Sequence, residues 1–373
     1  MKWVFWASGV LLTYTYFGYA AWLWFRSRYR RIEVCASAQT PSISIVMVVR
    51  DEAGVVERKL RNLLDVDYPP ELCEIIVVSD GSTDGTNDIL RQYANDLRVR
   101  VRLNQESRGK AAGLNDAIAM ARFEIVLFTD ARQKIEPGAV RLLAEPFADA
   151  NVGCASGELM LGDPTSGEAV RGMGLYWRIE KGIREMESAS GSVVGATGAL
   201  YAVRRELLVP VPPGTILDDV YIPMHVARQG SRVIFVPSAR AWDVADQGSG
   251  REFSRKVRTL TGNYQLVQLA PWLLSGSNPI RFEFISHKLL RLFAPFALAA
   301  AFMASLLLPQ PVYRIALVLQ LGFYTLSLIA MMKLARGPLA RVADAASTFV
   351  ILNTAALVAF AKFVTGRRVA WVR

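Results

Sequence analysis

The chain has 373 residues, 52% of them hydrophobic, and a formal net charge of +10 at pH 7. The excess of Lys and Arg does not predict nucleic-acid binding, because these residues gather beside long apolar segments, where anionic lipid headgroups account for them. The three cysteines show no metal-ligand spacing and are interpreted as reduced thiols of a cytoplasmic domain. With only two histidines, a histidine-based metal site is not expected.

The first predicted element is a membrane span. Residues 3–25 carry no charged side chain, and a helix of this length can cross a hydrocarbon core of ~30 Å. Arginines follow at Arg26, Arg28, Arg30 and Arg31. The positive-inside rule places the next domain in the cytoplasm. We therefore expect a transmembrane helix at 1–25 and a cytoplasmic domain at 26–250.

Strands and helices alternate along the first half of that domain. The predicted strands are 42–49, 74–78, 99–103 and 125–129, and the predicted helices are 55–64, 86–93 and 110–121. This alternation is typical of an α/β fold with a parallel sheet. Further strands at 152–161, 193–203 and 231–236, and helices at 168–187 and from 217 onwards, are expected to complete the domain.

The C-terminal third is predicted to be membrane-associated. Residues 251–274 are basic and amphipathic, which suits a helix in the membrane interface, with a solvated charged face as the alternative. We expect interface helices at 251–286 and two or three spans within 287–373. The span candidates are 289–308, 315–332 and a shorter, weaker segment at 345–361. If all three cross, the basic tail lies outside, against the positive-inside rule, so one segment is expected to be re-entrant or interfacial.

Four polar loops follow the first four predicted strands. They are Arg50-Asp51-Glu52, Ser79-Asp80-Gly81-Ser82, Arg108-Gly109-Lys110 and Asp130-Ala131-Arg132. Ligands bind beyond the carboxyl ends of strands in open α/β sheets, so these loops are expected to converge on one site. Carboxylates can bind a nucleobase, a ribose or a divalent cation, and a lysine that opens a helix suits a diphosphate. Each loop alone is commonly a simple turn, but the four together predict a nucleotide site.

This constellation resembles the inverting glycosyltransferase family 2, which has a mixed-sheet, Rossmann-like GT-A fold, over about 41–245. The resemblance rests on Val77-Val78-Ser79-Asp80-Gly81-Ser82-Thr83-Asp84, on Gly109-Lys110 with Gly113-Leu114-Asn115, and on Phe128-Thr129-Asp130. With predicted spans at both ends, the chain looks like the membrane-bound cellulose, chitin and poly-N-acetylglucosamine synthase branch.

The resemblance implies a nucleotide-sugar donor, expected to be a UDP-sugar, and a Mg²⁺ or Mn²⁺ ion. It places Asp51, with its neighbour Glu52, and Asp80 at the nucleobase and ribose positions. Lys110 falls near the diphosphate. Asp130 is the first carboxylate of the family's Asp-x-Asp metal motif.

Arg132 stands at the third position of that motif, where the family has aspartate. One interpretation keeps the metal, held by Asp130, donor phosphates and water, since Mg²⁺ commonly uses only one or two protein carboxylates. The other has Arg132 neutralise the diphosphate by bidentate contact. We expect the metal to be retained.

The catalytic base is assigned by the same resemblance. The family places a Glu-Asp pair eleven residues before a glycine that precedes a strand, and Asp219 holds this position before Gly230, with Asp218 as its acidic neighbour. An exposed helix N-terminus is the alternative for these two aspartates.

The family's Gln-x-x-Arg-Trp motif is absent from the following basic segment, where Arg255 and Arg258 are expected to act on the leaving diphosphate. Processive polymerisation and transfer of a single sugar both stay open.

The expected protein is a multi-pass inverting glycosyltransferase of the bacterial inner membrane. Its expected partners are a nucleotide-sugar donor, a lipid-linked or saccharide acceptor, membrane lipids and polysaccharide-assembly proteins. A polyprenyl-phosphate or ceramide-type lipid glycosyltransferase is the first alternative. The second is an inactive membrane scaffold with a GT-A shell.

Overall fold

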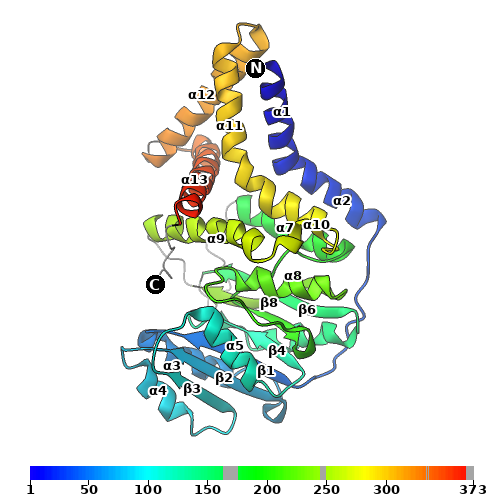
Figure 1. Cartoon of the computed structure of the whole chain (residues 1–373), viewed down its shortest axis with the longest axis vertical. Helices are drawn as coiled ribbons and strands as arrows, with labels where there is room; N and C mark the ends of the chain where they lie inside the picture. The colour runs from blue at the N-terminus through cyan, green and yellow to red at the C-terminus, as the bar shows by residue number, and fades with distance from the viewer. Residues whose placement is uncertain (163–174, 244–248, 333, 335, 367–373) are drawn as a thin grey trace.

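The computed structural model describes residues 1–162, 175–243, 249–332, 334 and 336–366. A sheet with helices on both faces forms one end of the molecule, and long helices from both ends of the chain form the other (Figure 1). The strand order is β3-β2-β1-β4-β7-β6-β8-β5.

The first half of the sheet is parallel. It contains β1 (Ile43–Val49), β2 (Cys73–Asp80), β3 (Val99–Asn104) and β4 (Ile125–Phe128), with β1 between β2 and β4. The connecting helices are α3 (Ala53–Leu64), α4 (Thr86–Tyr93) and α5 (Lys110–Met120). Every residue of β1 and β2 is buried, as expected for strands covered on both faces. The predicted parallel arrangement is confirmed, so the four polar loops leave the same edge of the sheet.

The second half makes the sheet mixed. It contains β5 (Lys134–Ile135), β6 (Val152–Leu161), β7 (Tyr201–Arg204) and β8 (Arg232–Asp243). β7 runs antiparallel to both β4 and β6, and β8 runs parallel to β6. The helices of this half are α6 (Ala139–Ala144), α7 (Leu175–Ser190) and α8 (Asp218–Arg228), and short 3₁₀ segments lie at Pro70–Leu72, Glu145–Ala148 and Arg205–Leu207.

Apolar side chains fill both faces of the sheet. On one face, Ile45 and Val77 pack with Leu60 of α3. On the other, Val46 packs with Leu114 of α5 and Ile222 of α8. The alternation of side chains along each strand sends successive residues to opposite layers, which is why the central residues of β1 and β2 are apolar on both faces.

One predicted strand is wrong over most of its length. Residues 193–200 form a loop, and the strand is limited to Tyr201–Arg204. The loop bends at Gly195, whose φ of +89° is incompatible with a strand. The predicted helix at 168–187 lies partly outside the described residues; the described helix, α7, ends at Ser190. The predicted strand at 231–236 extends further, to Asp243.

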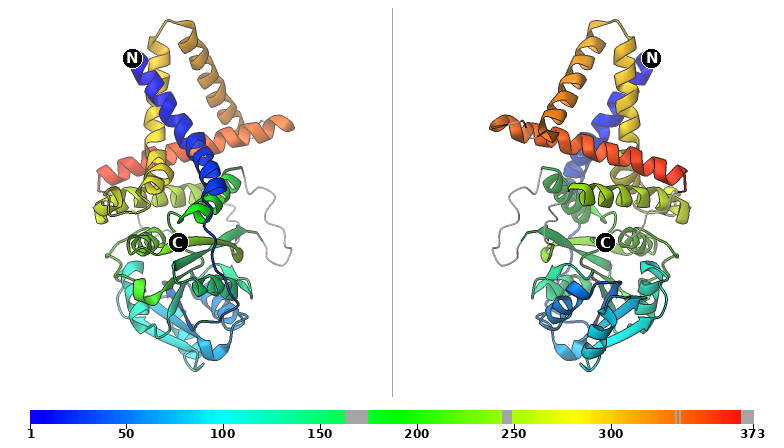
Figure 2. Two further views of the ribbon diagram at one scale, coloured as in Figure 1. Left: turned by 90° about the vertical axis from the view of Figure 1, so that its right-hand side faces the viewer. Right: turned by 90° about the vertical axis from the view of Figure 1, so that its left-hand side faces the viewer.

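The remaining helices form the other end of the molecule. They are α1 (Lys2–Thr13), a π turn (Tyr14–Gly18), α2 (Tyr19–Tyr29), α9 (Ser249–Leu269), a 3₁₀ turn (Pro271–Leu274), α10 (Arg281–Phe284), a π turn labelled η6 (Ile285–Leu289), α11 (Leu290–Leu307), α12 (Pro311–Met331) and α13 (Pro338–Val364). Figure 2 shows α1, α11 and α12 pointing away from the sheet, whereas α13 runs across them beside α9.

Within the described residues, three helical segments are long and apolar enough to cross a membrane. They are Arg281–Leu307, Pro311–Met331 and Leu339–Val364. The third was expected to be short, but α13 has 27 residues. The helix that begins at Lys2 is not among the three, so the span at 1–25 stays a prediction, as do the domain boundaries.

Candidate active site

Asp80 ends β2 and is fully buried. Its carboxylate accepts a hydrogen bond from the Ser107 hydroxyl at 2.8 Å and bonds from the backbone N–H groups of Arg108 and Gly109 at 2.8 and 2.9 Å. Gly81 follows with φ of +67°, and a Cβ there would lie 2.5 Å from the backbone nitrogen of Ser107. Asp80 therefore fixes the loop that precedes α5, and a direct contact with the donor stays a prediction.

Asp51 joins the loop after β1 to the loop after β2. Its carboxylate accepts hydrogen bonds from the backbone N–H of Thr83 at 2.8 Å and from the Thr83 hydroxyl at 3.2 Å, and its own N–H donates to the Ser82 hydroxyl at 3.1 Å. Its φ is +51°, and no other non-glycine residue in the described ranges has a positive φ. A strained backbone held by the surrounding structure is common at ligand-binding positions.

Glu52 and Arg132 connect the first and fourth loops. The Arg132 guanidinium donates to Glu52 Oε1 at 3.3 Å, and the Glu52 N–H donates to the Thr86 hydroxyl at 2.9 Å. The Arg132 side chain is thereby drawn towards Glu52. Asp130, two residues earlier, keeps a side chain that is 41% exposed.

Lys110 lies at the centre of the site. It opens α5, and its ammonium lies 3.0 Å from Oδ1 of Asp130 and 3.4 Å from Oδ2 of Asp218. Burial acts to lower the Lys110 pKa, but the charges of Asp130, Asp218 and Asp219 outweigh it and the pKa is raised. Lys110 is therefore a permanent cation that holds the end of β4 against the start of α8. We call Lys110, Asp130, Asp218 and Asp219 the Lys110 cluster.

Asp219 lies at the second position of α8, beneath the loop that replaces the predicted strand. The Ala196 N–H donates to the Asp219 backbone carbonyl at 2.6 Å, and a Cβ at Gly198 would lie 3.1 Å from Asp219 Oδ2. Burial and the neighbouring Asp218 raise the pKa of Asp219 to about 6, while Lys110 acts to lower it. A carboxylate tuned towards neutral pH is suited to accept a proton.

The structure does not bring every predicted residue to this cluster. Arg255 and Arg258 lie on α9, and within the described ranges no hydrogen bond or ion pair connects their side chains to the cluster. Their role at the leaving group stays a prediction.

Sequence reasoning missed Lys59. This lysine of α3 is buried, and its ammonium donates to the Thr129 hydroxyl at 2.8 Å and to the Gln133 carbonyl at 2.7 Å. Burial lowers the Lys59 pKa to about 7, although Asp130 acts to raise it. Its position on the same helical face as Val56 and Leu63 was the available signal, because a lysine inside an apolar stripe must find polar partners.

Two further residues near Asp219 were also missed. The Arg184 guanidinium donates to the Thr197 hydroxyl at 2.6 Å and to the Ser156 hydroxyl at 2.7 Å, and it stacks over the Phe235 ring. Tyr201 is fully buried, and its hydroxyl has no hydrogen-bond partner among the described residues. Burial and the charges of the nearby Asp218 and Asp219 raise the Tyr201 pKa well above its usual value. The sequence carries no local signal that either Arg184 or Tyr201 lies near Asp219.

The donor atoms of the site fit a hard divalent cation only in part. No group of three or more His, Cys, Asp or Glu side chains in the described residues could hold a metal by itself. Asp130 nevertheless offers a partly exposed carboxylate, and Arg132 is paired with Glu52. Mg²⁺ and similar ions commonly bind through one carboxylate together with substrate phosphates and water, so Asp130 fits as the single protein ligand.

Comparison with known families identifies the domain. Residues 44–209 match the model of glycosyl transferase family 2, a range that includes all four polar loops and stops short of Asp218. The chain carries a family 2 glycosyltransferase domain.

Curated relatives of this glycosyltransferase domain include polysaccharide synthases. A poly-beta-1,6-N-acetyl-D-glucosamine synthase of Staphylococcus aureus (strain MSSA476) is 25% identical over 230 residues, which are 60% of this chain and 55% of that protein. The synthase of the same name from Staphylococcus epidermidis is 23% identical over 238 residues, 63% of this chain and 57% of that protein. The chain thus matches little more than half the length of these relatives.

A solved structure resembles the glycosyltransferase along nearly its whole length. A mannosyltransferase from Pyrobaculum calidifontis, in complex with GDP-Man and Mn2+, matches with a TM-score of 0.74 at 24% identity. The match covers 97% of this chain and 99% of that one. At this identity the likeness concerns the fold, and it confirms the predicted GT-A fold class.

Proposed function

We propose that this chain is an inverting glycosyltransferase that moves a sugar from a nucleoside-diphosphate sugar to a hydroxyl acceptor at the membrane. The observation that carries the proposal is the position of Lys110, which contacts both Asp130 in the loop after β4 and Asp218 at the start of α8. This contact supports the proposal because it connects the N-terminus of α5, which suits a phosphate, with the start of α8, where Asp219 has a raised pKa.

The donor is proposed to bind over the loops of the parallel half-sheet. The N-terminus of α5 carries positive dipole charge, and Lys110 adds a full charge, so the diphosphate suits this point. An ammonium has three N–H donors, and two carboxylates leave one for a phosphate oxygen. Asp51 and Glu52 would then contact the nucleoside. A UDP-sugar is favoured because the curated relatives are N-acetylglucosamine polymer synthases.

Asp219 is proposed as the general base. The acceptor oxygen attacks the anomeric carbon as Asp219 takes its proton, and the bond between that carbon and the diphosphate oxygen breaks with its electron pair leaving on the nucleoside diphosphate. A single in-line displacement of this kind inverts the anomeric carbon. The pKa of about 6 leaves Asp219 largely ionised at neutral pH while keeping it a stronger base than an ordinary aspartate.

Asp130 is proposed to hold Mg²⁺ or Mn²⁺ together with the diphosphate. When bound, such an ion would neutralise charge on the departing diphosphate. Lys110 contributes to the same neutralisation, because its ammonium is fixed beside Asp130.

We further propose that the three apolar helices, together with residues 1–25, anchor the enzyme in a bacterial inner membrane with its sheet domain in the cytoplasm. The arginines that follow residue 25 support this orientation. The product would be an extracellular polysaccharide or a glycolipid, and polysaccharide-assembly proteins are its proposed partners.

The test is sugar transfer by purified protein. Detergent-solubilised enzyme is incubated with native membranes and a panel of radiolabelled UDP-sugars and GDP-sugars, and the products are analysed by mass spectrometry and proton NMR. One donor is expected to label a membrane product whose new linkage has the opposite anomeric configuration to the donor. Retained configuration would overturn the inverting mechanism, and folded protein that is inactive with every donor would overturn the proposed function.

A further inference from the structure

Charged side chains fill the junction between the sheet domain and the membrane helices. His287 of η6 lies between two carboxylates of α7, with Nδ1 2.8 Å from Glu187 and Nε2 2.8 Å from Glu180. The Tyr19 hydroxyl of α2 donates to Glu187 at 2.6 Å, and Arg291 donates to Glu180 at 2.8 Å. These contacts attach η6 and α11 to the catalytic domain at a fixed position.

Lys288 differs from its neighbours in this junction. Within the described residues it has no hydrogen bond or ion pair at contact distance, although the charges of Glu180 and Glu187 act on its ammonium. It lies next to His287 and one turn before Arg291. Its positive charge acts on Asp219, since Lys288, like Lys110, opposes the rise in the pKa of that carboxyl. Arg184 also lies within electrostatic range of Asp219. The cations Arg184 and Lys288 therefore share this junction with the carboxylates Glu180 and Glu187, between the proposed base and the start of α11.

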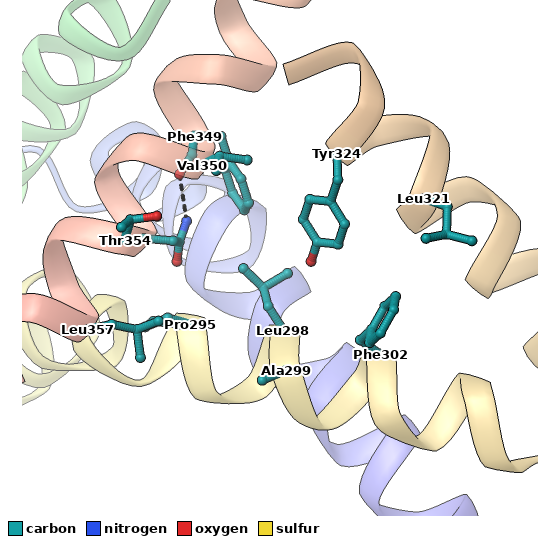
Figure 3. Close-up of a pocket in the computed structure, with 11 residues that line it drawn as sticks. Pro295, Leu298, Ala299, Phe302, Leu321, Tyr324, Phe349, Val350, Thr354 and Leu357 are labelled. Carbon is teal, nitrogen blue, oxygen red and sulfur yellow. Dashed lines mark hydrogen bonds between the residues drawn. The ribbon is translucent and has the colours of Figure 1, made fainter. Parts of the chain in front are cut away.

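An apolar cavity begins one helical turn beyond Arg291, at Pro295. Its volume is about 400 Å³, and it lies where α11, α12 and α13 meet. Figure 3 shows Pro295, Leu298 and Phe302 of α11 facing Tyr324 of α12 and Phe349 of α13. Because helical residues at i, i+4, i+7 and i+11 share a face, Arg291, Pro295, Leu298 and Phe302 form one stripe from the cations into the cavity.

We propose that this stripe binds the acceptor, a membrane lipid whose hydrocarbon chain occupies the cavity and whose phosphate-containing headgroup lies at Lys288 and Arg291. This inference rests on the proposed function, and it names the class of acceptor. The cavity has the size and apolar lining typical of small-molecule sites. Charged groups at membrane depth are costly and commonly mark the path of a polar substrate.

The phosphate is assigned as the anchor of the acceptor, and a hydroxyl of the same headgroup as the nucleophile. A phosphate oxygen is already ionised at neutral pH and needs no base, whereas a hydroxyl needs one, and Asp219 lies within electrostatic range of Lys288. The transfer then follows the displacement described above: the headgroup hydroxyl loses its proton to Asp219, its oxygen joins the anomeric carbon, and the nucleoside diphosphate leaves.

The test is equilibrium binding of tritiated farnesyl phosphate to the full-length protein in phosphatidylcholine nanodiscs, without any sugar donor. Farnesyl phosphate combines an apolar chain with a phosphate, farnesol has the chain alone, and inorganic phosphate has the charge alone. We expect saturable binding of farnesyl phosphate. Farnesol should compete at least tenfold more weakly than unlabelled farnesyl phosphate, and inorganic phosphate should not compete.

Matched variants locate the site. Lys288→Gln removes the proposed phosphate-binding cation, and its control, Arg281→Gln, removes an exposed cation at the same end of the helix. Leu298→Trp fills the cavity, and its control, Met303→Trp, adds the same ring on the exposed side of α11. Lys288→Gln and Leu298→Trp are each expected to weaken binding at least tenfold, with both controls near the wild type.

Three outcomes would overturn the inference. They are equal binding by all four variants, competition by farnesol as strong as that by farnesyl phosphate, and full competition by inorganic phosphate, which would indicate a site for free anions. Sugar transfer to native membranes is measured separately on the same wild-type protein. Transfer without lipid binding removes this inference and leaves the proposed function standing. Lipid binding without transfer removes the proposed function, and with it the role of the lipid as acceptor, and leaves only a lipid-binding site.

Discussion

The ammonium of Lys110 lies 3.4 Å from the carboxylate of Asp218, and this contact joins the two halves of the proposed active site. Lys110 belongs to the parallel half of the fold, which carries the proposed donor loops, whereas Asp218 begins the helix that carries Asp219. Donor binding and proton transfer are therefore expected to be coupled through one side chain.

Lys110→Met is expected to change both donor affinity and the pH profile. In the wild type, kcat/KM should fall as the pH drops through about 6, because Asp219 must be ionised to act as a base. Lys110 opposes the rise in the Asp219 pKa, so its removal should move this fall to higher pH and raise the KM for the donor. The measurement is the pH dependence of kcat/KM, with Lys134→Met, an exposed lysine of β5, as the control. An unchanged profile would contradict the coupling.

Asp219→Asn is expected to raise the thermal stability of the protein at neutral pH. The folded-state pKa of about 6 lies above the reference value of 3.8, so the contribution of Asp219 to stability is fully present below the lower value and is lost as the pH rises through about 6. The Tm of the variant should exceed that of the wild type at about pH 8, and the difference should vanish at about pH 4. A variant that melts below the wild type at the higher pH would show that the charge of Asp219 is stabilising.

Metal removal is expected to suppress transfer reversibly. Exhaustive EDTA treatment should remove most activity, and Mn²⁺ or Mg²⁺ should restore it, since Asp130 fits as a ligand together with the diphosphate. Binding of Mn²⁺ in the presence of UDP, followed by electron paramagnetic resonance, should weaken about tenfold in Asp130→Asn and stay unchanged in Asp67→Asn, an exposed control. Undiminished turnover after EDTA would favour neutralisation by Arg132.

Gly198→Ala is expected to lower kcat while the protein stays folded. A Cβ at this position would lie 3.1 Å from Oδ2 of Asp219, so the carboxylate must shift. Small displacements of a catalytic group can cost about tenfold or more in rate. Gly182→Ala on α7 is the control, because a Cβ there meets nothing within 4 Å. Equal kcat in the two variants would argue that Asp219 is not held at its working position by this loop.

Local patterns in the sequence were sufficient to predict the parallel half of the fold. Short uninterrupted apolar runs, at residues 45–49 and 75–78, mark β1 and β2, and the helix Thr86–Tyr93 has the bounds predicted for it. The convergence of Lys110 and Asp130 follows from the same reasoning, because parallel strands place their carboxyl ends at one edge.

Features that depend on tertiary contacts could not be predicted in this way. The apolar run from Val193 suggests a strand, but Gly195 turns the chain so that Ala196 bonds the backbone of Asp219. Asp80 follows a buried strand and was predicted to bind the ligand. In the folded chain its carboxylate instead accepts hydrogen bonds from the loop before α5, which local sequence patterns do not reveal. The contact of Lys110 with Asp218 likewise joins segments that are distant in sequence.

The central claim is that Asp219 is the catalytic base, and the most direct test is the rate of sugar transfer by Asp219→Asn under saturating donor and native membranes. Removal of a general base should lower kcat by at least about a hundredfold. Binding of UDP should stay within about twofold of the wild type, because the donor loops are unchanged, and Asp67→Asn should retain full activity. Transfer by Asp219→Asn at the wild-type rate would contradict the assignment.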